Sequence, residues 1–268
     1  MTTRTLSLAA LAALALAPAA CQRDHSDLGE RLDRIESRLA DIDRKLAAGA
    51  GVGAAAPRRE RPRPNPATTY SIPVDSAPLK GAKDALVTVV EGFEFACPYC
   101  EQSRGLVDQI LEAYPNDVRV AYKHFIVHPT TATVPALAAC AAHRQGKFDA
   151  MEALIWDKGF KAGRNLGAEN MEKLAAEAGL DVERFKADMN GAECKKLVRE
   201  DQAQLARVGT GGTPTFYVNG RWLQRRSFDE LKRLIDEELA KAKERVSAGT
   251  SRAAYYKEWV VDKGQKKL

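Results

Sequence analysis

Residues that bind metals are scarce in this sequence. Its 268 residues include four histidines and five cysteines, and only Cys97 and Cys100 form a closely spaced pair of cysteines. A zinc site built on such a pair needs two further ligands, usually a second pair of cysteines or closely spaced histidines. Cys140 and Cys194 are isolated, and His124 and His128 are the only histidines close to each other. We therefore expect no metal site.

The sequence also lacks the pattern of a nucleic-acid-binding surface. The formal net charge is +5, but basic residues cluster in two places, arginines between positions 58 and 63 and lysines between positions 257 and 267. Nucleic-acid-binding domains more often interleave basic and aromatic side chains on folded elements. We therefore expect no nucleic-acid partner.

The apolar run near the start of the chain is too short for a good membrane-spanning helix. It covers residues 6–17 and small residues follow it, an order typical of a signal peptide at residues 1–20. The small residues before Cys21 resemble a bacterial lipoprotein signal, in which the cysteine is lipidated, although Pro18 stands where leucine is preferred. Ordinary cleavage after the Ala-Pro-Ala segment 17–19 is the alternative. We favour lipidation, which would anchor the protein on a membrane.

Residues 26–47 carry hydrophobic residues at alternating spacings of four and three. This heptad pattern is typical of a coiled coil, and the flanking charges pair Arg31 with Glu36 and Arg38 with Asp43, as a parallel coiled coil requires. Leucine at a with isoleucine at d favours trimers or tetramers over dimers. We predict a homo-oligomer; the alternative is one amphipathic helix lying on its own domain. The repeat consists of Leu28, Leu32, Ile35, Leu39, Ile42 and Leu46.

The rest of the chain divides into a linker, one globular domain and a C-terminal extension. Residues 48–69 are rich first in alanine and glycine and then in proline and arginine, without an apolar period, which predicts a flexible, extended tether. The globular domain is expected at residues 70–245, an ordinary size for one hydrophobic core. Residues 246–268 are expected to form a short helix packed back on this domain.

Strands and helices alternate in the globular domain around a helical insertion. The β-branched run at 85–91 predicts a strand buried on both faces, and residues 118–125 predict a second strand parallel to it after an intervening helix. Residues from about 130 to 208 predict four or five helices separated by glycines. A hairpin at Asn219-Gly220 and a helix from Ser227 complete the domain. The separating glycines are Gly146, Gly159, Gly167, Gly179 and Gly191.

Cys97 and Cys100 lie where the first strand gives way to the following helix. Unpaired backbone N–H groups and the helix dipole stabilise negative charge there, so the first cysteine is expected as a thiolate, the nucleophilic form. The second cysteine lies one helical turn later, close enough to attack a mixed disulfide formed at the first. Pro98 falls at the first helical position, where its missing N–H costs nothing. The pattern predicts a redox-active pair.

With three further segments, this pair resembles the thioredoxin superfamily and most closely its DsbA-like branch, over about residues 70–240. The resemblance implies an α/β thioredoxin fold with an inserted helical domain, and no metal or organic cofactor. It also implies that Cys97 is the attacking cysteine and Cys100 the resolving one. The matching motifs are Phe93-Glu-Phe-Ala-Cys-Pro-Tyr-Cys100, the helical insertion, Gln145-Gly-Lys-Phe148 and Gly212-Thr-Pro-Thr-Phe-Tyr-Val-Asn-Gly220.

The resemblance implies roles for further residues around the pair. Pro214 would be a cis-proline beside it, with the Thr213 backbone offered to a substrate strand. Glu91 matches a buried acid whose raised pKa would let it exchange a proton with Cys100, the alternative being a solvated strand end. DsbA carries histidine where this chain has Tyr99, and glutaredoxins share the tetrapeptide found here, which indicates a milder oxidant than DsbA.

Two cysteines, Cys140 and Cys194, remain in the helical insertion. In an oxidising compartment such cysteines are more often paired than free, so we predict a structural disulfide, the alternative being two buried thiols. The pairing requires Cα atoms within about 7 Å. His128 lies where DsbA-like relatives often carry a histidine, and we interpret it as structural.

The sequence therefore predicts a thiol–disulfide oxidoreductase of the cell envelope or periplasm, held on a membrane as a lipoprotein. It would form disulfides in unfolded or partly folded exported proteins and be recharged by a membrane redox partner. Reduction potential decides the direction of exchange, so an isomerase or reductase that works as a coiled-coil oligomer is the alternative. A non-catalytic, tethered binding module is a more distant one.

Overall fold

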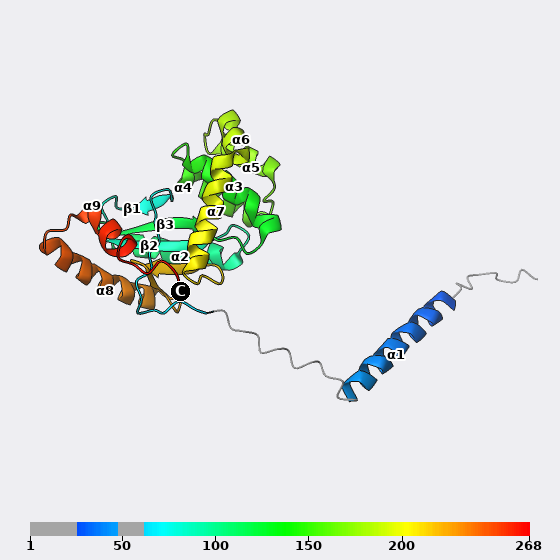
Figure 1. Ribbon diagram of the computed structural model, residues 1–268. Helices are drawn as coiled ribbons and strands as arrows, with labels where there is room; N and C mark the ends of the chain where they lie inside the picture. The colour runs from blue at the N-terminus through cyan, green and yellow to red at the C-terminus, as the bar shows by residue number, and fades with distance from the viewer. Residues whose placement is uncertain (1–25, 48–61) are drawn as a thin grey trace, which may run out of the picture. The chain divides into compact units, whose positions relative to one another are not determined.

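The computed structural model describes residues 26–47 and 62–268 of the chain (Figure 1). The expected signal peptide, Cys21 and most of the expected linker lie outside the described residues. The chain divides into two compact units, Met1–Glu60 and Arg61–Leu268. Within the described residues, no helix combines the length and the apolar character that crossing a membrane requires.

Helix α1 spans Ser26–Ala47, the range that the heptad pattern predicts. The seam side chains from Leu28 to Ile42 are between 52% and 56% exposed in the single chain. Charged side chains one turn apart pair along the helix, as Asp41 does with Lys45 at 2.7 Å. The helix is confirmed, and its association with other copies stays a prediction.

One five-stranded sheet organises the second unit, in the order β1-β3-β2-β4-β5. The neighbours β2 and β3 are parallel, and every other pair is antiparallel. The chain passes between β2 and β3 through helix α2, Pro98–Ala113, which is the predicted strand–helix–strand unit. The strands are β1 Leu79–Gly81, β2 Val87–Phe93, β3 Val118–His124, β4 Thr215–Val218 and β5 Arg221–Trp222.

Strand β2 is buried along its whole length and divides its side chains between two clusters. Val87, Val89 and Phe93 belong to the cluster on the face covered by α2 and by α8, Phe228–Ser247, whereas Val90 belongs to the cluster on the opposite face. Because successive side chains of a strand alternate between faces, Glu91 points to the face covered by α2. This alternation places an acid beneath the helix that begins next to Cys97.

The predicted helical insertion follows β3 and stands above one end of the sheet in Figure 1. Its glycines at 146, 167, 179 and 191 lie between or at the ends of helices, but Gly159 does not. Gly159 lies inside a π-helical segment, where a Cβ atom would meet Leu166 Cδ2 at 3.3 Å, so close packing explains this glycine better than a helix break. The segments are α3 Pro129–His143, α4 Phe148–Leu154, π-helical η1 Ile155–Phe160, α5 Ala168–Glu177, α6 Val182–Asn190 and α7 Ala192–Arg207.

Local signals set the boundaries of the last elements. Asn219 and Gly220 have φ angles of 43° and 79°, which suit the tight hairpin predicted between β4 and β5. The Ser227 hydroxyl accepts a hydrogen bond from the Glu230 backbone N–H and so caps α8. Both signals act over a few residues, which is why the sequence alone located them.

The ends of the folded unit pack on each other. Tyr70 forms a parallel bridge with Gln265, and the Tyr256 hydroxyl donates to the Ile72 carbonyl at 2.8 Å. The Asn65 N–H donates to the Tyr70 hydroxyl oxygen at 2.9 Å, so residues 62–69 lie against the domain instead of continuing the predicted tether, because their backbone groups find partners there. The C-terminal extension forms α9, Arg252–Tyr255, and π-helical η2, Tyr256–Val261.

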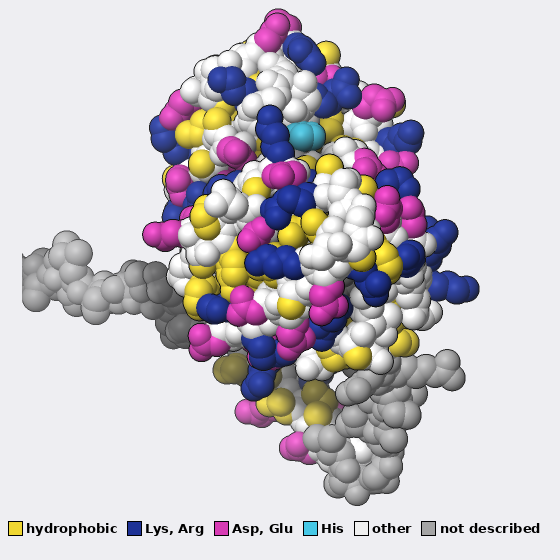
Figure 2. Space-filling model, turned by 90° about the vertical axis from the view of Figure 1, so that its left-hand side faces the viewer, with side chains coloured by type: hydrophobic (Ala, Val, Ile, Leu, Met, Phe, Trp, Pro, Cys, Tyr) yellow, Lys and Arg dark blue, Asp and Glu magenta, His cyan; other side chains and the backbone are white. Residues whose placement is uncertain are grey.

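Charges of both signs cover the surface of this unit. On the face shown in Figure 2, lysine and arginine side chains lie among acidic ones, with hydrophobic side chains between them. Many exposed ion pairs join two residues of the same helix, such as Lys173 with Glu169 on α5 and Lys232 with Asp236 on α8. Such pairs each contribute less than about 1 kcal/mol to stability, so the fold depends on its buried clusters.

Candidate active site

Cys97 lies at the N-terminus of α2, four residues beyond the end of β2. It is the N-cap residue, with extended backbone angles of φ −89° and ψ 118°, and Pro98 occupies the first helical position as predicted. The Cys100 backbone N–H donates to the Cys97 carbonyl at 3.1 Å, which begins the helix. Both cysteines are free thiols, 4% and 1% exposed.

The loop before β4 brings Thr213 and Pro214 to Cys97. β4 pairs with β2 so that Thr215 lies opposite Gly92, and the Thr213–Pro214 peptide bond is cis. The Cys97 thiol donates to the Thr213 carbonyl oxygen at 3.4 Å. A Cβ atom at Gly92 would lie 2.9 Å from Thr215 Cγ2, so glycine is what allows this loop to approach the end of β2.

The surroundings separate the pKa values of the two thiols. The hydrogen bond from the Cys100 thiol lowers the pKa of Cys97 to about 5, with help from the Thr213 side chain and backbone N–H groups and against the effect of burial. Burial raises the pKa of Cys100 above its ordinary value. Cys97 is therefore the nucleophilic thiolate at neutral pH, and Cys100 keeps its proton until a base removes it.

Glu91 is buried beneath this pair and is 4% exposed, so it is not a solvated strand end. Its Oε1 atom lies 2.8 Å from the Ser103 hydroxyl on α2. Burial raises the pKa of Glu91 to about 8, although the Ser103 hydrogen bond and the charge of Arg226 oppose this rise. A carboxyl group that titrates near neutral pH is suited to exchange protons with Cys100.

Glu94 is a site residue that the sequence reasoning missed. It is fully buried, and its carboxylate accepts the backbone N–H groups of Val127 at 2.7 Å and His128 at 2.9 Å and contacts His128 Nδ1. The hydrogen bond to Glu94 raises the pKa of His128, and the charge of Cys97 raises it further. His128 therefore supports the loop through Glu94, and the protonated form of its ring and the Cys97 thiolate favour each other.

Arg226 was also missed, because it lies far from the motif in the sequence. Its guanidinium carbon lies 5.5 Å from the centre of the Tyr99 ring, and Tyr99 is 57% exposed. A cation over an aromatic ring is attracted to its negative face. Tyr99 carries no charge of its own but holds a positive one beside the cysteine pair.

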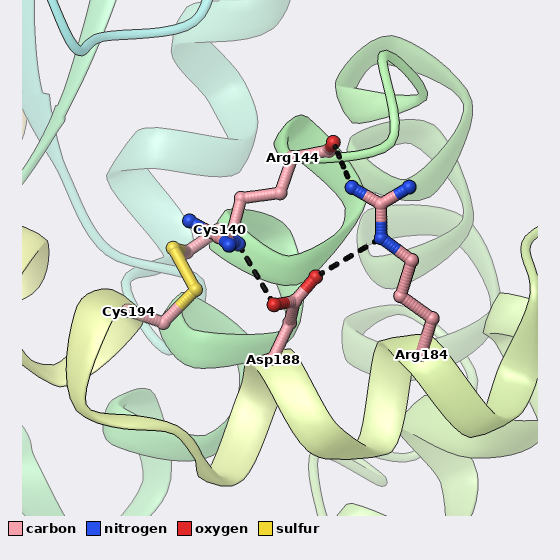
Figure 3. The surroundings of a disulfide bond; sticks show 5 residues. All are labelled: Cys140, Arg144, Arg184, Asp188 and Cys194. Carbon is pink, nitrogen blue, oxygen red and sulfur yellow. Dashed lines mark hydrogen bonds and ion pairs between the residues drawn. A yellow bond between two sulfur atoms is a disulfide. The ribbon is translucent and has the colours of Figure 1, made fainter.

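Cys140 and Cys194 form a disulfide in the helical insertion, with Cα atoms 5.6 Å apart, within the required limit. The bond joins α3 to the first turn of α7 (Figure 3). Beside it, Arg144 donates to Asp188 at 2.8 Å, and Arg184 approaches the other carboxylate oxygen at 3.6 Å. The Cys140–Cys194 disulfide is in a structural position, since it and the ion pairs around it hold neighbouring helices together.

The structure thus gathers most predicted site residues at one place. Cys97 and Cys100 lie with Glu91 beneath them and with the Thr213–Pro214 loop beside them. The disulfide lies apart in the insertion, and Cys21 is outside the described residues. Within the described ranges, no group of three or more His, Cys, Asp or Glu side chains is arranged to hold a metal ion.

Sequence comparison assigns the family. The profile of the family described as Thioredoxin matches residues 75–237, and the chain belongs to this family. A relative, the Na(+)/H(+) antiporter NhaA of Herminiimonas arsenicoxydans, is 37% identical over 152 residues, which are 56% of this chain and 23% of that protein. The chain therefore spans about a quarter of the length of this relative, so the match covers one part of a longer protein.

Solved structures share the fold. A thioredoxin-like oxidoreductase from Silicibacter pomeroyi DSS-3 is 29% identical, with a TM-score of 0.55 over 61% of this chain and 92% of that one. BdbD from Bacillus subtilis is 22% identical, with a TM-score of 0.60 over 66% and 100%. Wolbachia pipientis alpha-DsbA1 is 16% identical, with a TM-score of 0.55 over 65% and 96%. The predicted DsbA-like thioredoxin fold is confirmed.

Proposed function

We propose that this protein is a thiol–disulfide oxidoreductase of the cell envelope that forms disulfides in exported proteins. The observation that carries the proposal is the placement of Cys97 as the N-cap of α2 beside the Thr213 carbonyl, with Cys100 buried one turn later. This placement lowers the pKa of Cys97 to about 5 and raises that of Cys100. A sulfur that is stable as a thiolate is a good leaving group and a ready nucleophile, whereas its buried partner exchanges only within the site.

In the oxidising direction, a substrate thiolate attacks Cys97 of the Cys97–Cys100 disulfide. A bond forms between the substrate sulfur and Cys97, and Cys100 leaves with the electron pair and takes the proton of Glu91. A second substrate thiolate then attacks the first substrate sulfur, so that the substrate disulfide forms and Cys97 leaves as a thiolate. The substrate loses two electrons, and the reduced pair must pass them to a membrane redox partner.

Substrate binding at this site would use backbone and apolar contacts. The Thr213 backbone lies beside Cys97, and Tyr99 and Val127 expose 57% and 40% of their surfaces. An extended segment of an unfolded protein can pair with such a backbone and rest on such side chains. We propose unfolded or partly folded exported proteins as the substrates, and the periplasm, with the lipid anchor at Cys21, as the location.

Helix α1 favours a second candidate function, a disulfide isomerase or reductase that works as a coiled-coil oligomer. Its described seam residues are more than half exposed in the single chain, a surface that self-association would cover. Several sites on one assembly would raise their effective concentration on one misfolded substrate. Sedimentation of the protein without its lipid at micromolar concentration tests this assembly, and a monomer would contradict it.

Two measurements test the proposed function. Cys97→Ser should abolish exchange with a disulfide-containing test substrate, and undiminished exchange would favour the binding module. Equilibration in glutathione buffers, followed by alkylation of Cys97, tests the direction of exchange. A cysteine pair that is mostly reduced in a buffer at the redox poise of the secretory compartment indicates an oxidant. A cysteine pair that stays oxidised in far more reducing buffers indicates a reductase.

A further inference from the structure

Ser103 lies between the buried acid of the site and the protein surface. It is on α2, one turn beyond Cys100, and is 2% exposed. Its hydroxyl oxygen lies 2.8 Å from Glu91 Oε1 and 2.7 Å from the Cys100 carbonyl oxygen. Ser103 also lines a surface pocket of about 390 Å³, together with Arg226 and Phe228. One residue therefore both hydrogen-bonds Glu91 and lines a solvent-accessible space.

A hydroxyl group has one proton, and the Cys100 carbonyl can only accept it. When Glu91 is protonated, its O–H group donates to Ser103 Oγ, and Ser103 donates to the Cys100 carbonyl. When Glu91 is ionised, the Ser103 hydroxyl turns to donate to the carboxylate. The distances fit both states, so the hydroxyl can follow the protonation of Glu91 without movement of the backbone.

The proposed exchange reaction needs such a route. Each oxidising step takes a proton from Glu91 to Cys100 and leaves a carboxylate in a site that is 4% exposed. A buried carboxylate is costly unless it is paired or reprotonated. Among the described residues, Ser103 is the one side chain that hydrogen-bonds the Glu91 carboxyl group. Ser103 is therefore placed to connect this carboxylate with water.

We propose that Ser103 relays protons between Glu91 and solvent in the adjoining pocket. The inference rests on the proposed function and deepens it. In the oxidising direction, a water molecule in the pocket donates a proton to Ser103 Oγ as the hydroxyl proton passes to Glu91. The reverse transfer follows when Cys100 gives up its proton. One proton from solvent enters or leaves in each step, and no further reactant is consumed.

Other groups face Glu91 and bear on its titration. The charge of Glu152 on α4 raises the pKa of Glu91, as does that of Cys97, and the charge of Arg226 lowers it. Ionised Glu91 in turn raises the pKa of Cys100 and of Tyr122 on β3. None of these groups is hydrogen-bonded to Glu91 within the part of the chain that the structure describes, so the relay is assigned to Ser103.

Ser103→Thr and Ser103→Val form a matched pair that tests the relay, since they share a shape and differ in the hydroxyl. The rate to follow is reduction of the Cys97–Cys100 disulfide by a small thiol, from pH 5 to 9, in water and in heavy water. Val should slow the step at least about tenfold relative to Thr. Val should also move the pH profile of Glu91 upward, because the Ser103 hydrogen bond lowers that pKa.

Equal rates and equal pH profiles for Thr and Val would overturn the relay. Equal slowing of both variants with an unchanged profile would also overturn it, since that result reports packing alone. Thermal melting of both variants checks that they are folded, and Ser103→Ala provides a smaller change if the added methyl group is not accommodated. Cys97→Ser separates the relay from the proposed function. The exchange activity of this variant tests the proposed function and does not depend on the role of Ser103.

Discussion

The protein contains two pairs of cysteines on one domain, and they differ in every physical respect that matters. Cys97 and Cys100 are three positions apart at a helix N-terminus and are free thiols. Cys140 and Cys194 are 54 positions apart, come from two helices and are bonded. The first pair has Glu91 beneath it and the Thr213 carbonyl beside it, whereas the second lies next to the Arg144–Asp188 ion pair that holds two helices together. Sequence separation and surroundings, not the cysteines themselves, assign their roles.

The two roles follow from different free energies. A crosslink over 54 positions removes much of the freedom of the unfolded chain. A crosslink over three positions removes little, so the Cys97–Cys100 pair can open and close at low cost in stability. What distinguishes its two sulfurs is the hydrogen bonding at Cys97 and the burial of Cys100. The following predictions test this contrast.

The largest expected contrast is between removal of one pair and removal of the other. Cys140→Ala with Cys194→Ala should lower the free energy of unfolding by about 2–5 kcal/mol, because a long loop is released. The pKa of Cys97 should not change in this variant. Urea unfolding and the pH dependence of alkylation measure the two quantities.

Cys97→Ser is the control for this contrast, and it should lose exchange while changing stability by less than about 1 kcal/mol at pH 5, where the Cys97 thiolate contributes little. The contrast breaks down if loss of the buried disulfide leaves stability intact or shifts the pKa of Cys97.

The second prediction concerns the pH dependence of stability in the reduced protein. Cys97 has a folded pKa of about 5, below its ordinary value of 9, so it makes the protein more stable as pH rises from about 5 to 9. Glu91 has a folded pKa of about 8, above its ordinary value of 4.5, so its contribution is lost as pH rises toward 8. The two effects oppose each other between pH 5 and 8.

Single variants should expose each slope. In Glu91→Gln the free energy of unfolding should rise between pH 5.5 and 7.5, and in Cys97→Ser it should fall, each by up to about 1.4 kcal/mol per pH unit. Chemical denaturation of the reduced proteins over this range measures both. Slopes of the same sign in the two variants would show that the acid and the thiolate do not have opposite shifts.

The smallest expected effect is that of His128. His128→Ala removes a ring whose protonated form attracts the Cys97 thiolate and should raise the pKa of that thiol by about half a unit, which slows alkylation near pH 5. His143→Ala is the matched control, since His143 lies in the last turn of α3 and packs on Phe148 instead of on Glu94. An equal effect of both substitutions would assign the change to general surface charge instead of to the Glu94–His128 pair.

Much of the fold could be predicted because its signals are local or periodic. The heptad repeat located α1, the β-branched run located β2, and Asn219-Gly220 located the hairpin. The start of the folded unit was harder to predict, because residues 62–69 contain three prolines and are held in part by contacts with the distant Arg221. Gly159 was misread as a helix break for the same reason, since its need for space comes from Leu166 in the following loop.

The sequence by itself determined the reactive pair and the family resemblance and favoured the pairing of Cys140 with Cys194, because helix ends, motif spacing and cysteine number are visible in one dimension. Only the tertiary structure decided which charges surround Cys97 and which side chain hydrogen-bonds Glu91. Glu94 with His128, Arg226 over Tyr99, and Ser103 beside Glu91 are brought together by packing. Burial and charge separation set pKa values, and both depend on residues that are distant in the chain.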